Sequence, residues 1–169
     1  QPVINIANKE VSCLEALVRW HHPEKGMQPP LSFIPFLEET GLIVPVGDWI
    51  LRSACRQIKA LRTNGHSGLR MAVNISGRQF LQQDFAQSLG GLLQEIGLDP
   101  QALELEITES VLIRDTKGSA KMLSSLVERG VSIALDDFGT GYSPLSYLKR
   151  FPIHTLKIDR NFIQGVPQK

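Results

Sequence analysis

Acidic side chains stand at or near the ends of several short apolar runs, where they can act together. Glu15, Glu106, Asp136 and Asp137 are four carboxylates, and Asn74 adds a carboxamide oxygen. Oxygen-only ligands suit Mg²⁺ or Mn²⁺ better than Zn²⁺, and bound cations or raised pKa values would relieve the repulsion among the carboxylates. The adjacent Asp136 and Asp137 can direct one oxygen each toward a pair of metal ions where the chain leaves the regular pleat. The alternative interpretation of this pair is a solvated turn.

Basic and glycine-rich segments accompany these acids. Lys157 stands alone in an apolar run, so it is either a residue that faces the acids or a solvated lysine on an edge strand. Arg19 has the same parity as Glu15, and its planar guanidinium can pair with a phosphate or with one of the acids. The segment 138–143 contains two glycines, which permit close approach to a phosphate but also occur in ordinary connecting loops.

Short strand-like runs alternate with amphipathic helical segments along the chain. Strands are expected at Gln1 to Ile6, Val11 to Trp20, Met71 to Ser76, Leu103 to Thr108, Val131 to Leu135 and Thr155 to Ile158. Helices are expected from a cap at Ser32 to Gly41, from Val46 to Arg62 with a stop at Gly65, from Asp84 to Ile96 with a stop at Gly97, and from a cap at Asp115 to Gly130. An apolar stripe that includes Trp49, Ile58 and Leu61 predicts burial of the second helix against a sheet. The repeated strand-then-helix order predicts parallel βα units in one domain.

Within each expected strand, apolar and polar residues fall on opposite faces. The apolar face carries Leu14, Ala16, Val18, Met71, Val73, Ile75, Leu103, Leu105, Ile107, Val131, Ile133, Leu135, Leu156 and Ile158. The polar face carries Glu15, Arg19, Asn74, Ser76, Glu104, Glu106, Ser132, Asp136, Lys157 and Asp159. A flat doubly wound sheet would show nearly continuous apolar runs, so this segregation favours a (β/α) barrel with its site at the carboxyl ends of the strands. The chain offers about six strands where a closed barrel needs about eight and roughly 250 residues, so we expect an incomplete barrel.

Composition argues against several classes of protein. The 18 Lys and Arg residues against 17 Asp and Glu residues leave a formal net charge of +1, which provides no long-range attraction to polymeric nucleic acid or to a membrane surface. No run approaches the roughly 18 to 20 apolar residues of a membrane span. Cys13 and Cys55 lie in apolar segments without metal-ligand spacing, which is typical of buried thiols in a reducing compartment and favours the cytoplasm. Because the chain opens on strand-like residues without a methionine, we expect it to be cut from a longer protein.

These residues, in this order, resemble the EAL family of cyclic di-GMP phosphodiesterases along the whole chain. The name-giving tripeptide is matched by Glu15-Ala16-Leu17, inside a longer block that ends at Pro23. The other matching blocks are Phe33-Ile34-Pro35, Gly41-Leu42-Ile43, Val73-Asn74-Ile75-Ser76, Leu105-Glu106-Ile107-Thr108-Glu109, Asp136-Asp137-Phe138-Gly139-Thr140-Gly141-Tyr142 and Leu156-Lys157-Ile158-Asp159.

The resemblance implies a modified TIM barrel with one antiparallel strand. It also implies an enzyme that opens the bacterial second messenger cyclic di-GMP to linear pGpG with two Mg²⁺ or Mn²⁺ ions. The residues that match the family's metal ligands are Glu15, Asn74, Glu106, Asp136 and Asp137.

The resemblance further implies roles around the metals. Lys157, with Glu15 and Asp136, is assigned to catalysis, where the lysine would orient or deprotonate the attacking water. Arg19 would contact a substrate phosphate, and Leu17 lies beside it in the substrate-binding set. Glu109 would anchor the loop from residue 138 to residue 143.

Two departures from the family pattern stand out. Pro144 replaces a small polar residue of most members and would stiffen the loop. The chain ends at Lys169, whereas the family continues with two more βα units, so residues 1–169 are expected to form a partial EAL domain.

Two alternatives to an active phosphodiesterase are a catalytically inactive receptor for cyclic di-GMP and a scaffold that acts through a partner. The expected partners are cyclic di-GMP, a second copy of the chain in a homodimer, and sensory or cyclase domains fused to it. Any tether to the inner membrane would lie outside this segment.

Overall fold

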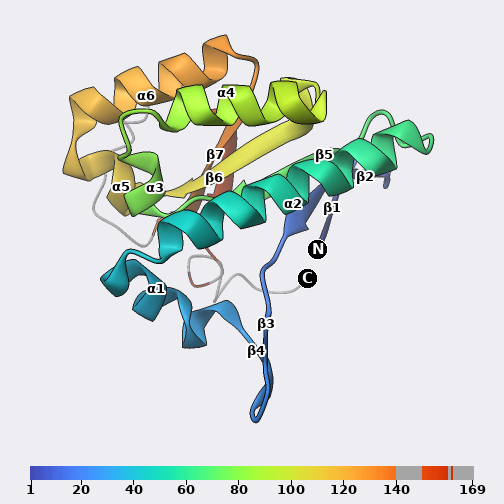
Figure 1. The fold of residues 1–169 in the computed structure, drawn as a ribbon. Coiled ribbons are helices and arrows are strands. Elements are labelled where there is room, and N and C mark those ends of the chain that lie inside the picture. Colours follow the sequence, from blue (N-terminus) through green and yellow to red (C-terminus); the bar gives the residue numbers. More distant parts are fainter. Residues whose placement is uncertain (140–149, 160, 162–169) are drawn as a thin grey trace.

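A six-stranded sheet organises the chain (Figure 1). In the computed structural model, which describes residues 1–139, 150–159 and 161, the strand order is β1-β2-β5-β6-β7-β8. β1 (Pro2–Ile4) runs antiparallel to β2 (Val11–Ala16). The parallel strands that follow are β5 (Arg70–Asn74), β6 (Leu103–Thr108), β7 (Ser132–Phe138) and β8 (Thr155–Ile158). The sheet is an open barrel-like α/β sheet with one antiparallel strand, which confirms the predicted fold class.

Helices connect the strands and cover one face of the sheet. The helices are α1 (Ile34–Thr40), α2 (Ile43–Thr63), α3 (Gly77–Phe80), α4 (Phe85–Ile96), α5 (Glu109–Arg114) and α6 (Thr116–Glu128), with 3₁₀ turns η1 (Pro30–Ser32) and η2 (Pro100–Ala102). Figure 1 shows α2, α4 and α6 side by side across this face, where α2 packs on β5 and α6 on β7. The opposite face of the sheet is the inner, lumen-side face of the open barrel.

The core lies between the sheet and these helices, as the predicted apolar face requires. Val73, Leu105 and Ile133 of the central strands are fully buried, and so is Ile58 of α2. The prediction is wrong at two places. Leu156 and Ile158 of the edge strand β8 are 46% and 56% exposed, because no described helix covers this strand. Trp49 of the α2 stripe is 62% exposed rather than buried against the sheet.

The predicted strand Val11 to Trp20 is in fact two separate elements. β2 ends at Ala16, the last of its residues to pair with β5. Trp20 instead begins β3 (Trp20–His22), which forms a small antiparallel sheet with β4 (Gly26–Gln28). Gly26 has a φ of +68°, a conformation that favours glycine and allows the tight turn between these strands.

The predicted helix ends are partly correct. Asp115 caps α6 by accepting a hydrogen bond from the Gly118 backbone amide at 3.0 Å. Ser32 does not cap α1, because it belongs to the preceding 3₁₀ turn and its hydroxyl donates to the Pro29 carbonyl. Asp84 precedes α4 without a side-chain capping bond. α2 begins at Ile43, earlier than predicted, because a proline in the first helical turn loses no intrahelical hydrogen bond.

A short helix that the sequence interpretation did not include holds the end of β5. Ser76 and Gln79 form a capping box, in which the Gln79 amide donates to the Ser76 hydroxyl at 3.3 Å and the Ser76 amide donates to Gln79 Oε1 at 3.4 Å. Gln79 is 2% exposed and lies against Gly47 of α2, where a Cβ would overlap its side chain. The contact between Gln79 and Gly47 fixes α3 against α2, directly after Asn74 in the chain.

We expect Gly47→Ala to destabilise the chain by about 1 to 3 kcal/mol, because the new methyl group and the buried Gln79 side chain cannot occupy the same space. Gly91→Ala, inside α4 with open space around its Cβ, is the matched control and should stabilise the chain by up to about 1 kcal/mol through helix propensity. Urea denaturation of both variants measures the difference. Equal stabilities would contradict the packing described for Gln79.

Two further sequence predictions concern the cysteines and the lack of a membrane-spanning segment. Cys13 and Cys55 are buried free thiols, as predicted, and burial raises the pKa of the Cys55 thiol to about 11, which makes it unreactive. Among the described residues, no helix combines the length and apolar character needed to span a membrane.

Candidate active site

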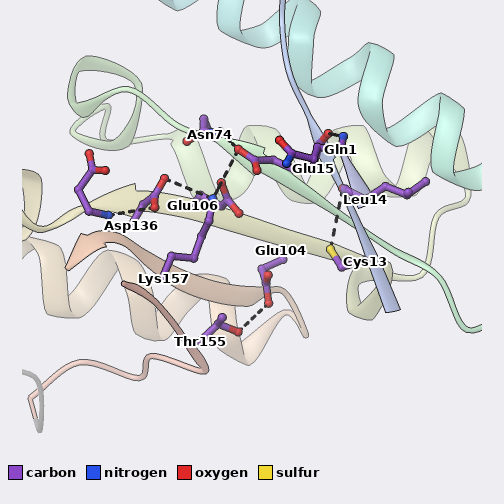
Figure 2. Close-up of polar contacts among 11 residues, drawn as sticks. Gln1, Cys13, Leu14, Glu15, Asn74, Glu104, Glu106, Asp136, Thr155 and Lys157 are labelled. Carbon is purple, nitrogen blue, oxygen red and sulfur yellow. Dashed lines mark hydrogen bonds and ion pairs between the residues drawn. The ribbon is translucent and has the colours of Figure 1, made fainter. Parts of the chain in front are cut away.

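The strand register brings the predicted acids to one face of the sheet. Asn74 of β5 lies opposite Glu106 of β6, and Thr108 at the end of β6 lies opposite Asp136 of β7. Glu15 of β2 pairs with Ala72, two residues before Asn74 and therefore on the same face. Figure 2 shows these side chains converging toward Lys157 of β8 at the carboxyl ends of the parallel strands.

Lys157 lies at the centre of the cluster. Its Nζ donates to Glu106 Oε2 at 2.6 Å and to Asp136 Oδ2 at 3.4 Å, and it lies 3.5 Å from Glu15 Oε1 (Figure 2). Asn74 Nδ2 donates to Glu15 Oε1 at 3.1 Å. Of the two interpretations of Lys157, the one in which it faces the acids is therefore correct.

Burial and charge perturb the cluster strongly. Burial raises the pKa of the Glu106 carboxyl from 4.5 to about 7, although the hydrogen bond and charge of Lys157 act in the opposite direction. For Lys157, burial alone would lower the pKa, but the hydrogen bond to Glu106 and the charges of Glu106, Asp136 and Glu15 raise it. The site thus holds three carboxyl groups around one ammonium, and an additional cation would relieve the cost of ionising Glu106.

The neighbouring acids Asp136 and Asp137 lie in an irregularity of the β7–β8 ladder. Leu135 pairs with Leu156 and Phe138 with Ile158, so two β7 residues stand opposite Lys157 alone. Asp137 has a φ of +54°, and its amide donates to Asp136 Oδ1 at 2.9 Å. This bulge interrupts the alternation that would otherwise send the two side chains to opposite faces. Partial burial and the charge of Asp136 raise the pKa of Asp137.

The positive φ of Asp137 leads to a stability prediction. Asparagine tolerates this conformation, so Asp137→Asn should unfold at nearly the same urea concentration as the wild type in metal-free buffer. Asp137→Val should cost about 1 to 2 kcal/mol, because a β-branched residue is strained there. A valine variant as stable as the asparagine variant would show that the bulge does not require the left-handed conformation.

The donor set fits hard divalent cations by its chemistry. Its donor atoms are carboxylate oxygens with one carboxamide oxygen, which suit Mg²⁺ or Mn²⁺. Within the described residues, no three His, Cys, Asp or Glu side chains are arranged around a single ion position, and the Lys157 ammonium lies where the carboxylates meet. Cation binding therefore requires these carboxylates to adjust around Lys157.

The remaining predicted residues lie around this cluster. Leu17 is 38% exposed and lines a cavity of about 490 Å³ together with Glu15 and Arg19. Arg19 donates to the Val18 carbonyl at 2.8 Å and forms no ion pair with the acids in the described part of the chain. A second cavity of about 790 Å³ is lined by Leu17, Asn74 and Thr108 at the same edge of the sheet.

Glu109 begins α5 directly after β6 and is 6% exposed. Its Oε1 is buried and has no hydrogen-bond partner among the residues that the structure describes. Glu109 is predicted to anchor the loop from residue 138 to residue 143. Its residues 140–143, and Pro144 after them, lie outside the described residues, so the anchoring role stays a prediction.

Sequence reasoning missed a second polar layer beside the cluster. Glu104 was placed on the polar face but given no role, and Arg70 and Thr155 were not considered. These residues lie two positions before Ala72, Glu106 and Lys157 on their strands, so the same period of two identifies them.

The EAL domain family profile matches residues 1–169, the whole chain. The chain belongs to the EAL domain family. This result confirms the family resemblance drawn from the motifs.

Curated relatives of this EAL domain include the bifunctional diguanylate cyclase/cyclic di-GMP phosphodiesterase MucR of Pseudomonas aeruginosa. It is 45% identical over 163 residues, which cover 96% of this chain and 24% of the relative. The cyclic di-GMP phosphodiesterase PdeR of Escherichia coli is 45% identical over 157 residues, covering 93% of this chain and 24% of the relative. The chain spans about a quarter of the length of these two curated relatives.

Solved structures agree with this assignment. The PaMucR phosphodiesterase in complex with cyclic di-GMP aligns with a TM-score of 0.94 at 44% identity, covering 100% of this chain and 68% of that chain. The FimX EAL domain from Pseudomonas aeruginosa bound to cyclic di-GMP aligns with a TM-score of 0.86 at 26% identity, covering 99% and 67%. The barrel-like sheet described above is thus the fold of EAL domains.

Proposed function

We propose that this chain hydrolyses cyclic di-GMP to linear pGpG with two Mg²⁺ or Mn²⁺ ions. The observation that carries the proposal is the convergence of Glu15, Glu106 and Asp136 on Lys157 at the carboxyl ends of parallel strands, within 3.5 Å of its Nζ. Membership of the EAL family and the relatives named as cyclic di-GMP phosphodiesterases support it.

The residues that would hold the cations are Glu15, Asn74, Glu106, Asp136 and Asp137. When bound, such ions supply Lewis acidity toward the phosphate and a water of lowered pKa. The chain's contribution is a set of oxygen donors from four neighbouring strands, carried by a rigid sheet rather than by loops. The bulge at Asp136 and Asp137 allows consecutive residues to contribute two carboxylates to one site.

Lys157 would orient the attacking water beside the phosphate. The raised pKa of its ammonium keeps it protonated at neutral pH in the metal-free chain, so it acts as a hydrogen-bond donor and positive charge. Of the two roles that the family resemblance implies, this charge state supports orientation over deprotonation.

The substrate would lie over the strand ends, with a phosphate reached by Arg19 and with Leu17 in contact. Both residues line the 490 Å³ cavity next to Glu15, and Leu17 also lines the 790 Å³ cavity next to Asn74. Exposed Arg19 has its guanidinium engaged only with the adjacent Val18 carbonyl among the described atoms, so it can turn toward an anionic ligand.

The domain would work inside a longer signalling protein, since it spans only 24% of MucR, whose name includes a diguanylate cyclase. Location in the cytoplasm and assembly into a homodimer stay predictions.

The test is chromatographic detection of pGpG after incubation of the chain with cyclic di-GMP and Mg²⁺ or Mn²⁺. We expect product with either ion, none with EDTA, and at least about a hundredfold less with Glu15→Ala. Binding of cyclic di-GMP in Ca²⁺ without any product in Mg²⁺ or Mn²⁺ would contradict the proposal and assign the receptor alternative instead.

A further inference from the structure

A second polar layer lies beneath the carboxylate cluster on the same face of the sheet. Glu104 Oε2 accepts hydrogen bonds from Arg70 Nη1 at 3.0 Å and from Thr155 Oγ1 at 3.0 Å. The layer therefore joins β5, β6 and β8 through one carboxylate oxygen. Figure 2 shows Thr155 and Glu104 next to the pair Lys157 and Glu106.

The carboxyl group of Glu104 lies in a nearly closed environment. Its residue is 4% exposed, and burial of an unpaired carboxylate is costly, so the Arg70 guanidinium and the Thr155 hydroxyl are needed as partners. The Glu104 carboxyl group therefore holds Arg70 and Thr155 in place, because losing either hydrogen bond would leave a buried polar group without a partner and would cost free energy.

Among the strands that Glu104 connects, β8 depends most on this side-chain contact for its position. It has only four residues, and in the described sheet it pairs with β7 alone. Its ladder contains the bulge opposite Lys157, and its outer residues Leu156 and Ile158 are largely exposed. Backbone pairing and packing therefore fix this strand less firmly than the central strands.

Side-chain hydrogen bonds also attach β8 to β6, although β7 lies between these two strands in the sheet. Thr155 and Lys157 are two residues apart on β8, as Glu104 and Glu106 are on β6, and these strands are not neighbours in the sheet. The hydrogen bond from Thr155 to Glu104 thus sets the distance between β8 and β6. It does so two residues before the position where Lys157 bonds to Glu106.

We propose that Glu104, anchored by Arg70, and Thr155 are positioning residues that set the place of the Lys157 ammonium among the catalytic carboxylates. The inference rests on the proposed phosphodiesterase function for its effect on turnover. The effect on the position of the Lys157 side chain does not depend on that function and can be measured without turnover.

The decisive variants are Thr155→Val, which removes the hydroxyl and keeps the branched shape, and Thr155→Ser, which keeps the hydroxyl. We expect Thr155→Val to lower kcat about tenfold with KM nearly unchanged, because the ammonium is displaced from the reacting phosphate. Thr155→Ser should restore most of kcat. Ser132→Ala is the matched control, since its hydroxyl lies on the same face of β7 and makes no hydrogen bond within the described residues.

The second readout is the rate at which an N-hydroxysuccinimide acetate ester modifies Lys157, followed by peptide mass spectrometry. Lys157 should react several-fold faster in Thr155→Val than in the wild type, Thr155→Ser or Ser132→Ala. Wild-type kcat and wild-type labelling in Thr155→Val would overturn the inference, as would equal losses in the valine and serine variants. If neither the wild type nor any variant forms pGpG, the proposed function is wrong. The labelling rates of Lys157 still decide whether Thr155 positions it.

Discussion

Replacing Glu106 with glutamine should reduce pGpG formation by about a thousandfold and at the same time stabilise the metal-free chain above pH 7. The loss of activity follows from the place of Glu106, whose carboxylate touches the Lys157 ammonium at 2.6 Å in the centre of the cluster. A glutamine keeps the shape but removes the charge that a divalent cation and the ammonium both need. Product formation with Mn²⁺ measures this part.

The gain in stability follows from the raised pKa of Glu106, which burial brings to about 7. An acid whose pKa is higher in the folded state binds more protons there than in the unfolded chain, where its pKa is about 4.3. The free energy of unfolding therefore falls as pH rises from about 4.3 to about 7, and the full penalty is present above that range. Glutamine carries no charge to desolvate, so the variant lacks this penalty.

Thermal unfolding in EDTA at pH 5 and at pH 8 measures the effect. The wild type should lose more stability between these values than Glu106→Gln does. Glu128→Gln is the control, because it removes a carboxylate from the exposed end of α6. An identical pH dependence in wild type and Glu106→Gln would show that Glu106 is not the buried acid that limits stability.

Replacing Lys157 with methionine should both lower activity strongly and make the stability of the chain depend more on bound metal. The change leaves Glu15, Glu106 and Asp136 without the ammonium that now lies within 3.5 Å of each. Removing one partner from a largely buried ionic cluster costs about 3 kcal/mol, so the metal-free variant should unfold at clearly lower urea concentration. Turnover should fall about a hundredfold or more because the charge that orients the water is lost.

Divalent cations should restore part of this stability, since they replace the missing positive charge. The increase in unfolding temperature on adding Mg²⁺ or Ca²⁺ should be larger for Lys157→Met than for the wild type. Lys121→Met, on the exposed side of α6, is the control for loss of a lysine charge. A methionine variant as stable as the wild type in EDTA would contradict the central position of Lys157.

Period-two alternation was sufficient to predict the main features of the site. Glu15, Glu106, Asp136 and Lys157 were placed on one face because their apolar neighbours must pack against helices. That inference holds wherever a strand has a helix on one side and the lumen on the other, as in β5, β6 and β7.

Features that depend on which strands pair could not be predicted in this way. The alternation from Val11 onward continues past Ala16, but only the pairing with β5 decides where β2 ends. The bulge at Asp136 and Asp137 arises from the β7–β8 register, and the dipeptide alone is more typical of a solvated turn. The exposure of Leu156 follows from the edge position of β8, which no local pattern reveals.

The most direct test of the account is a single-turnover reaction of cyclic di-GMP with excess chain and Mn²⁺ in water enriched in the heavy oxygen isotope. We predict that the wild type converts the bound cyclic di-GMP to pGpG with one heavy oxygen on its terminal phosphate, as attack of water on phosphorus requires, and that Glu106→Gln leaves the cyclic dinucleotide intact. Cyclic di-GMP that stays bound and uncleaved on the wild type, or equal product from both proteins, would contradict the assignment of this cluster as a phosphodiesterase centre.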